Sequence, residues 1–124
     1  MNCPFCFCNP SRLIVETNGA RSLYDGFPLS SGHALVVPRQ HVASLFELSE
    51  EVRAEIWSVV GQVRAILKEE FHPDGFNIGL NDGVAAGQTV GHAHVHIIPR
   101  FLGDIADPRG GIRWIIPGKA KYWE

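Results

Sequence analysis

The sequence contains no long apolar segment and no run of basic residues, and each absence excludes a class of protein. No stretch approaches the ~20 apolar residues of a membrane-spanning helix. The formal net charge is −2 and the basic residues are scattered, so the charge pattern does not indicate binding to nucleic acid or to a membrane surface. We therefore expect a small molecule as the binding partner.

Cysteine is also scarce in this chain. It has 3 cysteines among 124 residues, all in the segment CPFCFC between Cys3 and Cys8. An odd number in so short a segment suits metal binding or surface thiols better than a disulfide framework. The N-terminus lacks the basic and apolar regions of a secretory signal peptide, so we expect a cytoplasmic protein.

The length and the order of apolar segments predict a single domain over residues 1–124. Short apolar stretches bounded by turn residues predict strands at residues 12–17, 20–26, 33–38 and 76–81. Asn18-Gly19 predicts a two-residue hairpin turn between the first two strands. These strands, with the helix described next, indicate an α+β domain with a mostly antiparallel sheet.

Residues 48–71 have the apolar period of a helix, with Ser49 as its N-cap. One face of this helix is apolar and should cover a sheet: Ile56, Val59, Val60, Val63, Ile66 and Leu67. Residues 99–124 show no clear period, and we expect them to form an ordered C-terminal tail on the sheet.

Half of the 6 histidines lie at alternating positions in the stretch HAHVHII, as His92, His94 and His96. In a β-strand the three imidazoles would share one face, and the apolar residues between them would face the core. A strand rises ~3.3 Å per residue, which puts the first and third histidine Cα atoms roughly 13 Å apart, whereas zinc ligands lie about 2 Å from the metal. One zinc ion can therefore hold an adjacent pair but not all three.

This spacing favours a division of labour, in which one neutral imidazole is a nucleophile and its neighbours orient it or donate to an anion. The alternative is a histidine-rich strand face without a role.

The stretch HAHVHII resembles the His-x-His-x-His-x-x motif of the histidine triad family of nucleotide hydrolases and transferases. Two longer segments resemble the family too, DGFPLSSGHALVVPRQH and NDGVAAGQTVGHAHVHIIPR, so the similarity covers about residues 3 to 102. The Gln-Thr-Val start and the Ile-Pro-Arg end look closest to the diadenosine polyphosphate hydrolase, or fragile histidine triad, branch. The resemblance implies a HIT-like domain with a five-stranded sheet, one long and one short helix, and a homodimer across which the sheet continues.

The family mechanism implies that His94 attacks the α-phosphorus of a nucleoside phosphate and forms a covalent nucleotidyl-histidine, which water then hydrolyses. His96 would hydrogen-bond the phosphate oxygens or the leaving group, and His33 would support the triad. Gln88 and Thr89 match a Gln-Ser/Thr pair that lies beside the scissile phosphate. The substrate implied is a dinucleoside polyphosphate, such as diadenosine tri- or tetraphosphate.

The same resemblance implies the remaining substrate contacts. Asp25 would bind the ribose hydroxyls, Asn81 would reach the phosphate chain, and Gly87 would lie beside it. An apolar slot for an adenine base would be formed by Phe5 or Phe7, Leu23 and Leu35. On the residues alone, Asp25 and Asn81 are ordinary turn residues and the apolar ones ordinary core.

The spacing of Cys3 and Cys6 allows both thiolates to bind one zinc ion. Resemblance to prokaryotic family members adds His41 and His92 to this structural zinc site, and residues 1–10 would then form a zinc-knuckle-like N-terminus. Cys8 could compete with Cys6, and free thiols are the alternative. A divalent cation bound with the substrate phosphates would also suit the family.

Two other functions remain open from the sequence. One is a nucleoside phosphoramidase, which would cleave a P–N bond through the same His94. The other is a nucleotide-binding signalling module with weak turnover, while a zinc-storage or zinc-dependent structural protein is a third and weaker alternative.

Overall fold

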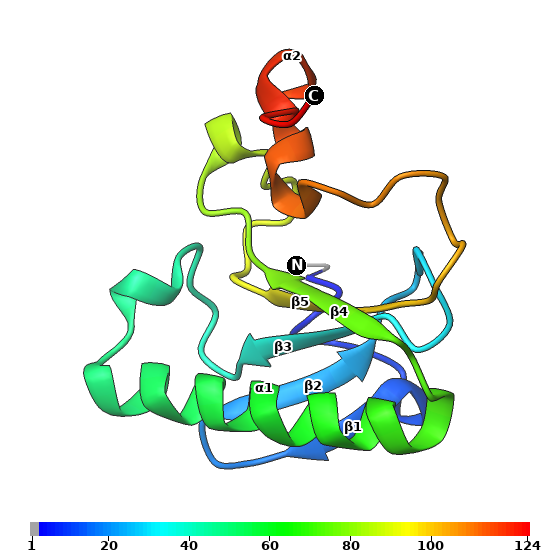
Figure 1. Cartoon of the computed structure of the whole chain (residues 1–124). Coiled ribbons are helices and arrows are strands. Elements are labelled where there is room, and N and C mark those ends of the chain that lie inside the picture. Colours follow the sequence, from blue (N-terminus) through cyan, green and yellow to red (C-terminus); the bar gives the residue numbers. More distant parts are fainter. Residues whose placement is uncertain (1–2) are drawn as a thin grey trace.

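The computed structural model describes residues 3–124, and within this range five strands form one sheet (Figure 1). The strands are β1 (Leu13–Glu16), β2 (Ala20–Tyr24), β3 (Ala34–Pro38), β4 (Gly75–Gly79) and β5 (Val95–Arg100). Their order across the sheet is β1-β2-β3-β5-β4, and each neighbouring pair is antiparallel. The expected α+β domain with an antiparallel sheet is confirmed.

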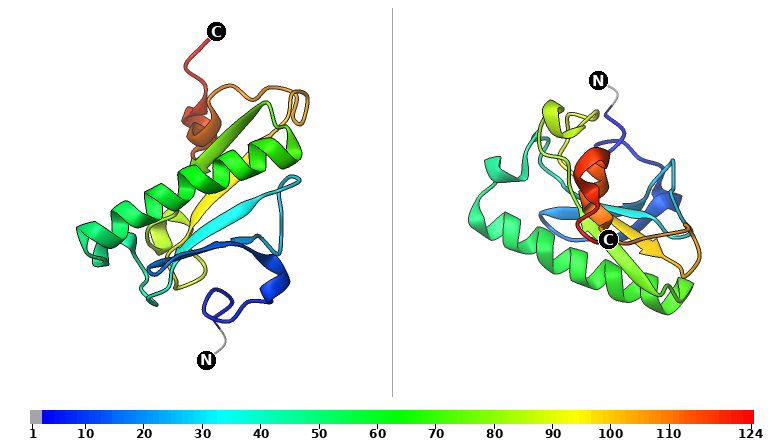
Figure 2. Two further views of the ribbon diagram at one scale, coloured as in Figure 1. Left: turned by 90° about the horizontal axis from the view of Figure 1, so that it is seen from below. Right: turned by 45° about the horizontal axis from the view of Figure 1, so that its top comes forward.

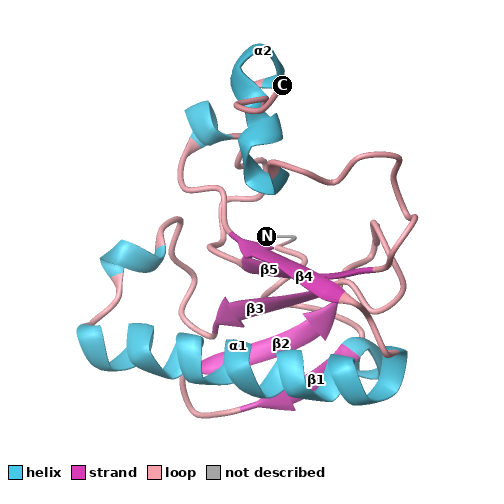
Figure 3. Cartoon of the chain, viewed as in Figure 1, coloured by secondary structure: helices cyan, strands magenta, loops and turns pink. Residues whose placement is uncertain are grey.

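The long helix α1 (Glu50–Phe71) lies across one face of this sheet (Figure 3). Its N-cap is Ser49, as predicted, because the Ser49 Oγ accepts a hydrogen bond from the Val52 N–H. It ends where His72 adopts a left-handed conformation, with φ 54°. The predicted apolar face is buried except for Ile66, which is half-buried. No helix within residues 3–124 is long and apolar enough to cross a membrane.

The sheet is packed on both faces, because α1 covers one side and the N-terminal segment lies on the other (Figure 2). Side chains alternate along β3, so Val36 packs toward α1 while Leu35 and Val37 pack toward the N-terminal segment. The core under α1 is the larger one. The smaller core on the opposite face consists of Phe5, Leu23, Leu35 and Val37.

The turn between β1 and β2 has the predicted length but not the positive φ angles that Asn-Gly allows, since neither Asn18 nor Gly19 has a positive φ. A carboxylate from α1 shapes it instead. Glu55 Oε2 accepts hydrogen bonds from the Gly19 N–H at 2.7 Å and from the Thr17 hydroxyl. This tertiary contact replaces the local conformational preference of the two turn residues.

The C-terminal tail runs beside β4 and β5 and contains a turn of 3-10 helix (Gly111–Ile115) and the short helix α2 (Pro117–Ala120). In Figure 1 it is the orange-to-red segment above the strands. Ile112 packs over Gly79 of β4, and Gly111 lies beside Asn77. The tail therefore adds a wall to the face of the sheet that α1 leaves uncovered.

A glycine directly before His33 is required by the fold. Gly32 has φ +88°, and a Cβ atom there would lie 2.7 Å from the Phe71 ring. We expect Gly32→Ala to lower the free energy of unfolding by about 2–4 kcal/mol, from left-handed strain and overpacking. Urea denaturation measures this change. The control is Gly61→Ala, on the open side of α1, which should stabilise by up to about 1 kcal/mol; equal effects of both variants would contradict the prediction.

Candidate active site and metal site

The three alternating histidines lie on the sheet face opposite α1. Strand pairing begins only at Val95, so His92 and His94 precede the hydrogen-bonded part of β5. The predicted alternation nevertheless holds, because Ala93, Val95 and Ile97 are buried in the core under α1. The predicted positions of both faces are thus confirmed, although His92 and His94 are themselves buried.

The hydrogen bonds of His94 determine which ring nitrogen is free. Its Nδ1 lies 2.9 Å from the backbone carbonyl oxygen of His92, which can only accept. Nδ1 therefore carries the proton, and Nε2 of the neutral ring has a lone pair. The Phe5 ring packs against the imidazole, with centroids 4.9 Å apart, and leaves the side chain 9% exposed. His94 is thus a fixed imidazole with an available nucleophilic nitrogen.

His96 carries the opposite tautomer, and a chain of hydrogen bonds sets it. The Leu29 N–H donates to His33 Nδ1 at 3.0 Å, so the proton of neutral His33 is on Nε2. This Nε2 lies 2.9 Å from His96 Nδ1 and donates to it. Because His96 Nδ1 accepts this hydrogen bond, the single ring proton of neutral His96 is on Nε2. The pair His94 and His96, whose ring centroids are 5.0 Å apart, offers one lone pair and one N–H donor.

Burial favours the neutral form of the His96 and His33 rings. It lowers the pKa of His96 to about 4, assisted by the neighbouring His94 and His33 rings and opposed by the Asp25 carboxylate. Burial also lowers the pKa of His33, again against the effect of Asp25. The Asp25 Oδ2 lies 3.4 Å from His33 Nε2, while its Oδ1 accepts from the Phe27 N–H at 2.8 Å. The half-buried Asp25 carboxylate is held at the site by contacts with a neutral histidine ring and a backbone N–H.

Asp25, His33 and His96 also lie close enough to hold a metal ion. The tautomer of His33 does not suit metal binding, because its Nε2, which faces Asp25 and His96, carries a proton and has no lone pair for a metal. We therefore assign the three side chains to a hydrogen-bonded relay.

The four predicted zinc ligands come together in the structure. The donor atoms of Cys3, Cys6, His41 and His92 all lie within 4.8 Å of one another. Cys3 Sγ and Cys6 Sγ are 3.4 and 3.5 Å from His92 Nδ1, and the Nδ1 atoms of His41 and His92 are 3.1 Å apart. Ligands on a tetrahedral zinc ion are separated by about 3.3–3.8 Å, from bond lengths of 2.0–2.3 Å. Cys8 is outside this group and packs against the smaller core.

His92 also has the tautomer that a metal ligand needs. Its Nε2 donates to the Pro38 carbonyl at 2.8 Å, which leaves the lone pair on Nδ1, the atom that faces the thiols. The spacing, the paired thiols and this tautomer fit zinc. Arg21 was not identifiable from the sequence as part of this site; its guanidinium donates to the carbonyls of Phe5 and Cys6 and so holds the cysteine loop on β2.

The glycine-bearing loop before His92 is held by one predicted site residue. Gln88 Nε2 donates to the Ala43 and Val90 carbonyls, and its Oε1 accepts from the Gly83 N–H. Gly87 has φ +97°, which a residue with a side chain rarely adopts. Thr89 is exposed in the same loop. In this structure the Gln88 amide thus supports the loop, and its contact with a substrate stays a prediction, as does that of Thr89.

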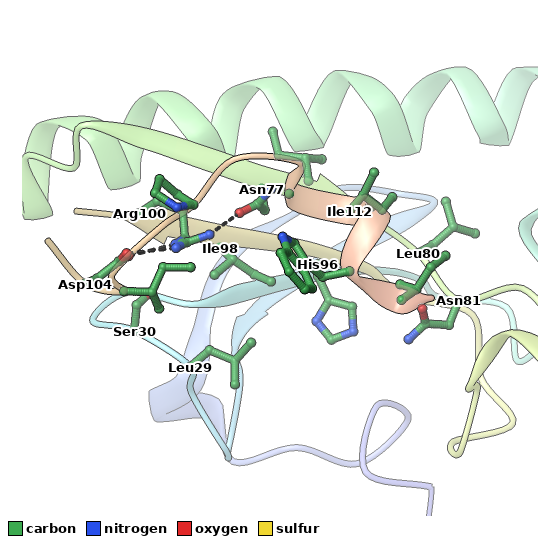
Figure 4. Close-up of a pocket in the computed structure, with 17 residues that line it drawn as sticks. Leu29, Ser30, Asn77, Leu80, Asn81, His96, Ile98, Arg100, Asp104 and Ile112 are labelled. Atoms are coloured by element: carbon green, nitrogen blue, oxygen red, sulfur yellow. Dashed lines mark hydrogen bonds and ion pairs between the residues drawn. The ribbon is translucent and has the colours of Figure 1, made fainter. Parts of the chain in front are cut away.

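The predicted base slot does not coincide with the pocket that lies beside His96. Phe5, Leu23 and Leu35 are buried together in the smaller core, while Phe7 is exposed. A pocket of about 820 Å³ opens instead beside His96 and is lined by Asn81, the end of β5 and the C-terminal tail (Figure 4). Asn81 and His96 share this pocket. The aperiodic tail residues that form its wall were not identifiable from the sequence.

With this geometry established, comparison with known proteins gives the family. The family described as HIT domain matches residues 7–103, and the chain belongs to it. The bis(5'-nucleosyl)-tetraphosphatase [asymmetrical] of Schizosaccharomyces pombe is 40% identical over 97 residues, which are 78% of this chain and 53% of that protein. The adenosine 5'-monophosphoramidase hnt1 of the same yeast is 38% identical over 104 residues, 81% of this chain and 75% of the relative. The chain thus spans only about half of the tetraphosphatase.

Solved structures show the same fold. A Zn-bound histidine triad family protein from Mycobacterium smegmatis has a TM-score of 0.72 and 36% sequence identity, and the match covers 80% of this chain and 72% of that one. The predicted family and fold class are therefore confirmed. The two relatives are named as enzymes, one as a tetraphosphatase and the other as a monophosphoramidase.

His96 should make stability depend on pH. The pKa of a histidine in the unfolded chain is near 6.5, whereas burial lowers the pKa of His96 in the fold to about 4. Between these values the unfolded chain binds a proton that the folded chain does not, so the free energy of unfolding falls as the pH is lowered from about 6.5 to about 4. We expect urea denaturation at pH 7 and at pH 4.5 to show a smaller loss in His96→Gln than in the wild type. An equal loss in both would refute this origin.

Proposed function

We propose that this protein hydrolyses nucleoside phosphates through a covalent nucleotidyl intermediate on His94. The observation that carries the proposal is the pair of opposite tautomers, with the lone pair of His94 Nε2 beside the N–H of His96. A nucleophile and a hydrogen-bond donor for phosphate oxygens are the two groups that transfer of a nucleotidyl group needs. Membership of the HIT domain family supports the same reaction.

The reaction would proceed in two displacements. His94 Nε2 forms a bond to the α-phosphorus, and the bond from phosphorus to the leaving phosphate breaks, with the electron pair going to the leaving group. Water then attacks the phosphorus, the P–N bond breaks, and the electron pair returns to Nε2. The products are a nucleoside monophosphate and the leaving phosphate, and the two protons of the attacking water go to the solvent as both new terminal phosphates ionise. His96 Nε2–H would stabilise the charge on the phosphate oxygens in both steps.

Dinucleoside polyphosphates are the substrates we propose first, with adenine as the base. The 40% identity to the tetraphosphatase of fission yeast supports this choice, together with the Gln-Thr pair before the triad. Asp25 would take the ribose hydroxyls, since its carboxylate lies 4.0 Å from His96 Nδ1. Phosphoramidates are the second candidate, because a relative of similar identity is named for that activity.

We propose further that Cys3, Cys6, His41 and His92 hold a structural zinc ion. The ion would tie the N-terminal segment to the histidine strand and leave His94 and His96 free for chemistry. A divalent cation with the substrate phosphates is compatible with this site. We also propose a homodimer, for which the edge strand β4 with its exposed Ile78 is the candidate contact.

The covalent step can be tested by brief mixing of the protein with diadenosine tetraphosphate and a panel of other nucleotides, followed by peptide mass spectrometry. We expect a nucleotidyl adduct on His94. His94→Ala should remove the adduct and lower turnover by about a thousandfold or more, because the nucleophile is lost. The control is His72→Asn, since His72 is exposed at the end of α1 and Asn tolerates its left-handed conformation. If no nucleotide of the panel gave either an adduct or a product, the proposed reaction would be contradicted.

The metal site has a test of its own. We expect the purified protein to contain one zinc ion per chain by elemental analysis, and chelation to lower its melting temperature. Cys6→Ser should lose most of the zinc, because one thiolate of the group is removed. Cys8→Ser is the matched control and should retain it, since Cys8 is outside the group. A zinc-free protein, or equal retention in both variants, would contradict the assignment.

A further inference from the structure

The residue before Asp25, the proposed ribose ligand, is held by an arginine from the N-terminal segment. Arg12 ends a turn of 3-10 helix (Pro10–Arg12), in which its own N–H donates to the Asn9 carbonyl at 2.9 Å. The Arg12 guanidinium reaches β2, where Nε and one terminal nitrogen donate to the Tyr24 carbonyl oxygen at 3.0 and 2.8 Å. A planar guanidinium with two donors on one oxygen fixes the side chain and the carbonyl relative to each other.

The geometry of the sheet explains why the Tyr24 carbonyl takes a side chain as its partner. The N–H of the next residue, Asp25, donates to the His33 carbonyl on the β3 side at 2.9 Å. Because the polar groups of successive residues in a strand point to opposite sides, the Tyr24 carbonyl points toward β1. β1 begins only at Leu13, which pairs with the residue before Tyr24. The Arg12 guanidinium therefore continues the hydrogen bonding that β1 no longer provides.

The same guanidinium also covers the start of the loop between β2 and β3. It lies against Gly26, since a Cβ atom there would be 3.5 Å from a terminal nitrogen of Arg12. Within residues 3–124 Arg12 forms no ion pair, so its donors serve this backbone. Residues 24 to 26 are thus held on one side by Arg12 and on the other by the His33 carbonyl.

The Asp25 carboxylate depends on this backbone for its direction. Its Oδ1 accepts from the Phe27 N–H at 2.8 Å, which ties the side chain to the following turn, and its Oδ2 lies 3.4 Å from His33 Nε2. A carboxylate that is hydrogen-bonded to its own turn moves with that turn. A shift of the backbone at Tyr24 or Gly26 would therefore turn the carboxylate away from the proposed position of the ribose hydroxyls.

We infer that Arg12 is a positioning residue for recognition of the ribose. By holding the Tyr24 carbonyl, it sets the direction of the Asp25 carboxylate, and so sets the preference of the site for nucleotides that carry both ribose hydroxyls. The inference rests on the proposed function, in which Asp25 binds these hydroxyls. Arg12 itself contacts the backbone, so its effect on the nucleotide passes through Asp25.

Calorimetry with AMP and with 2′,3′-dideoxy-AMP tests the role of Arg12. The second ligand lacks both hydroxyls, so the ratio of the two affinities measures the contact with Asp25. We expect Arg12→Met to lower this ratio about fivefold or more, by weakening AMP while the affinity for the dideoxy ligand stays within about twofold. Partial unfolding would remove binding sites for both ligands alike, and therefore would not change the ratio.

Two further arginine variants serve as controls. Arg12→Lys still donates to the Tyr24 carbonyl and should give a ratio between those of the wild type and Arg12→Met. Arg53→Met removes an arginine that donates to the Leu48 carbonyl at 2.7 Å, at the start of α1, and should leave the ratio within about twofold. A ratio as low as that of Arg12→Met in either variant would overturn the inference.

A double-mutant cycle separates a positioning role from a direct contact with the ligand. Asp25→Ala removes the carboxylate and should abolish most of the preference for AMP. In that background Arg12→Met should lower the ratio by no more than about twofold, because Arg12 acts through Asp25. The same loss in both backgrounds would show that Arg12 acts independently of Asp25, and would overturn its positioning role.

The outcomes distinguish failure of this role from failure of the proposed function. If the wild type bound both ligands equally, the ribose contact of Asp25 would be contradicted, and the role of Arg12 with it. If the wild type preferred AMP and Arg12→Met kept that preference, only the role of Arg12 would be overturned. A fall of the ratio in Arg12→Met would support it even if no adduct formed on His94, because binding is measured without turnover.

Discussion

The candidate active site depends on His92, three of whose polar groups each make a different contact. Its carbonyl oxygen accepts the proton of His94 Nδ1, its Nε2–H donates to the Pro38 carbonyl, and its Nδ1 faces Cys3, Cys6 and His41. The residue is fully buried, so each polar group must have a partner inside the protein. The proposed nucleophile His94 is therefore oriented by the same residue that contacts the cysteine loop.

One face of the sheet packs against α1, and the opposite face carries the three histidines. The core under α1 takes Ala93, Val95 and Ile97, which fixes the register of the histidines on the other face. On that face the loop between β2 and β3 supplies a backbone N–H to His33, and through His33 it sets the tautomer of His96. Opposite tautomers on adjacent histidines follow from different backbone partners and cannot be obtained from residue types alone.

Several features could be predicted from the sequence because they depend on neighbouring residues or on the periodic spacing of apolar residues. The Ser49 cap, the buried face of α1 and the alternation around His94 each follow from helix or strand geometry. The predicted zinc ligands followed from a resemblance to the family, and the structure brings these four side chains together. The Asn18-Gly19 turn was only half predicted, since Glu55 decides its conformation from α1.

By itself, the sequence determined the strands and helix and which face each histidine takes, because these properties depend on spacing along the chain, and its motifs resembled those of the family that the comparisons then showed. Only the tertiary structure decided the tautomers of His94 and His96, the use of the Gln88 amide within its own loop, and the pocket under the tail. The pairing of Arg100 with Asp104 and Asn77 joins β5, the tail and β4, and no local pattern encodes it. Such contacts form between segments distant in sequence, where burial and available partners determine geometry and charge.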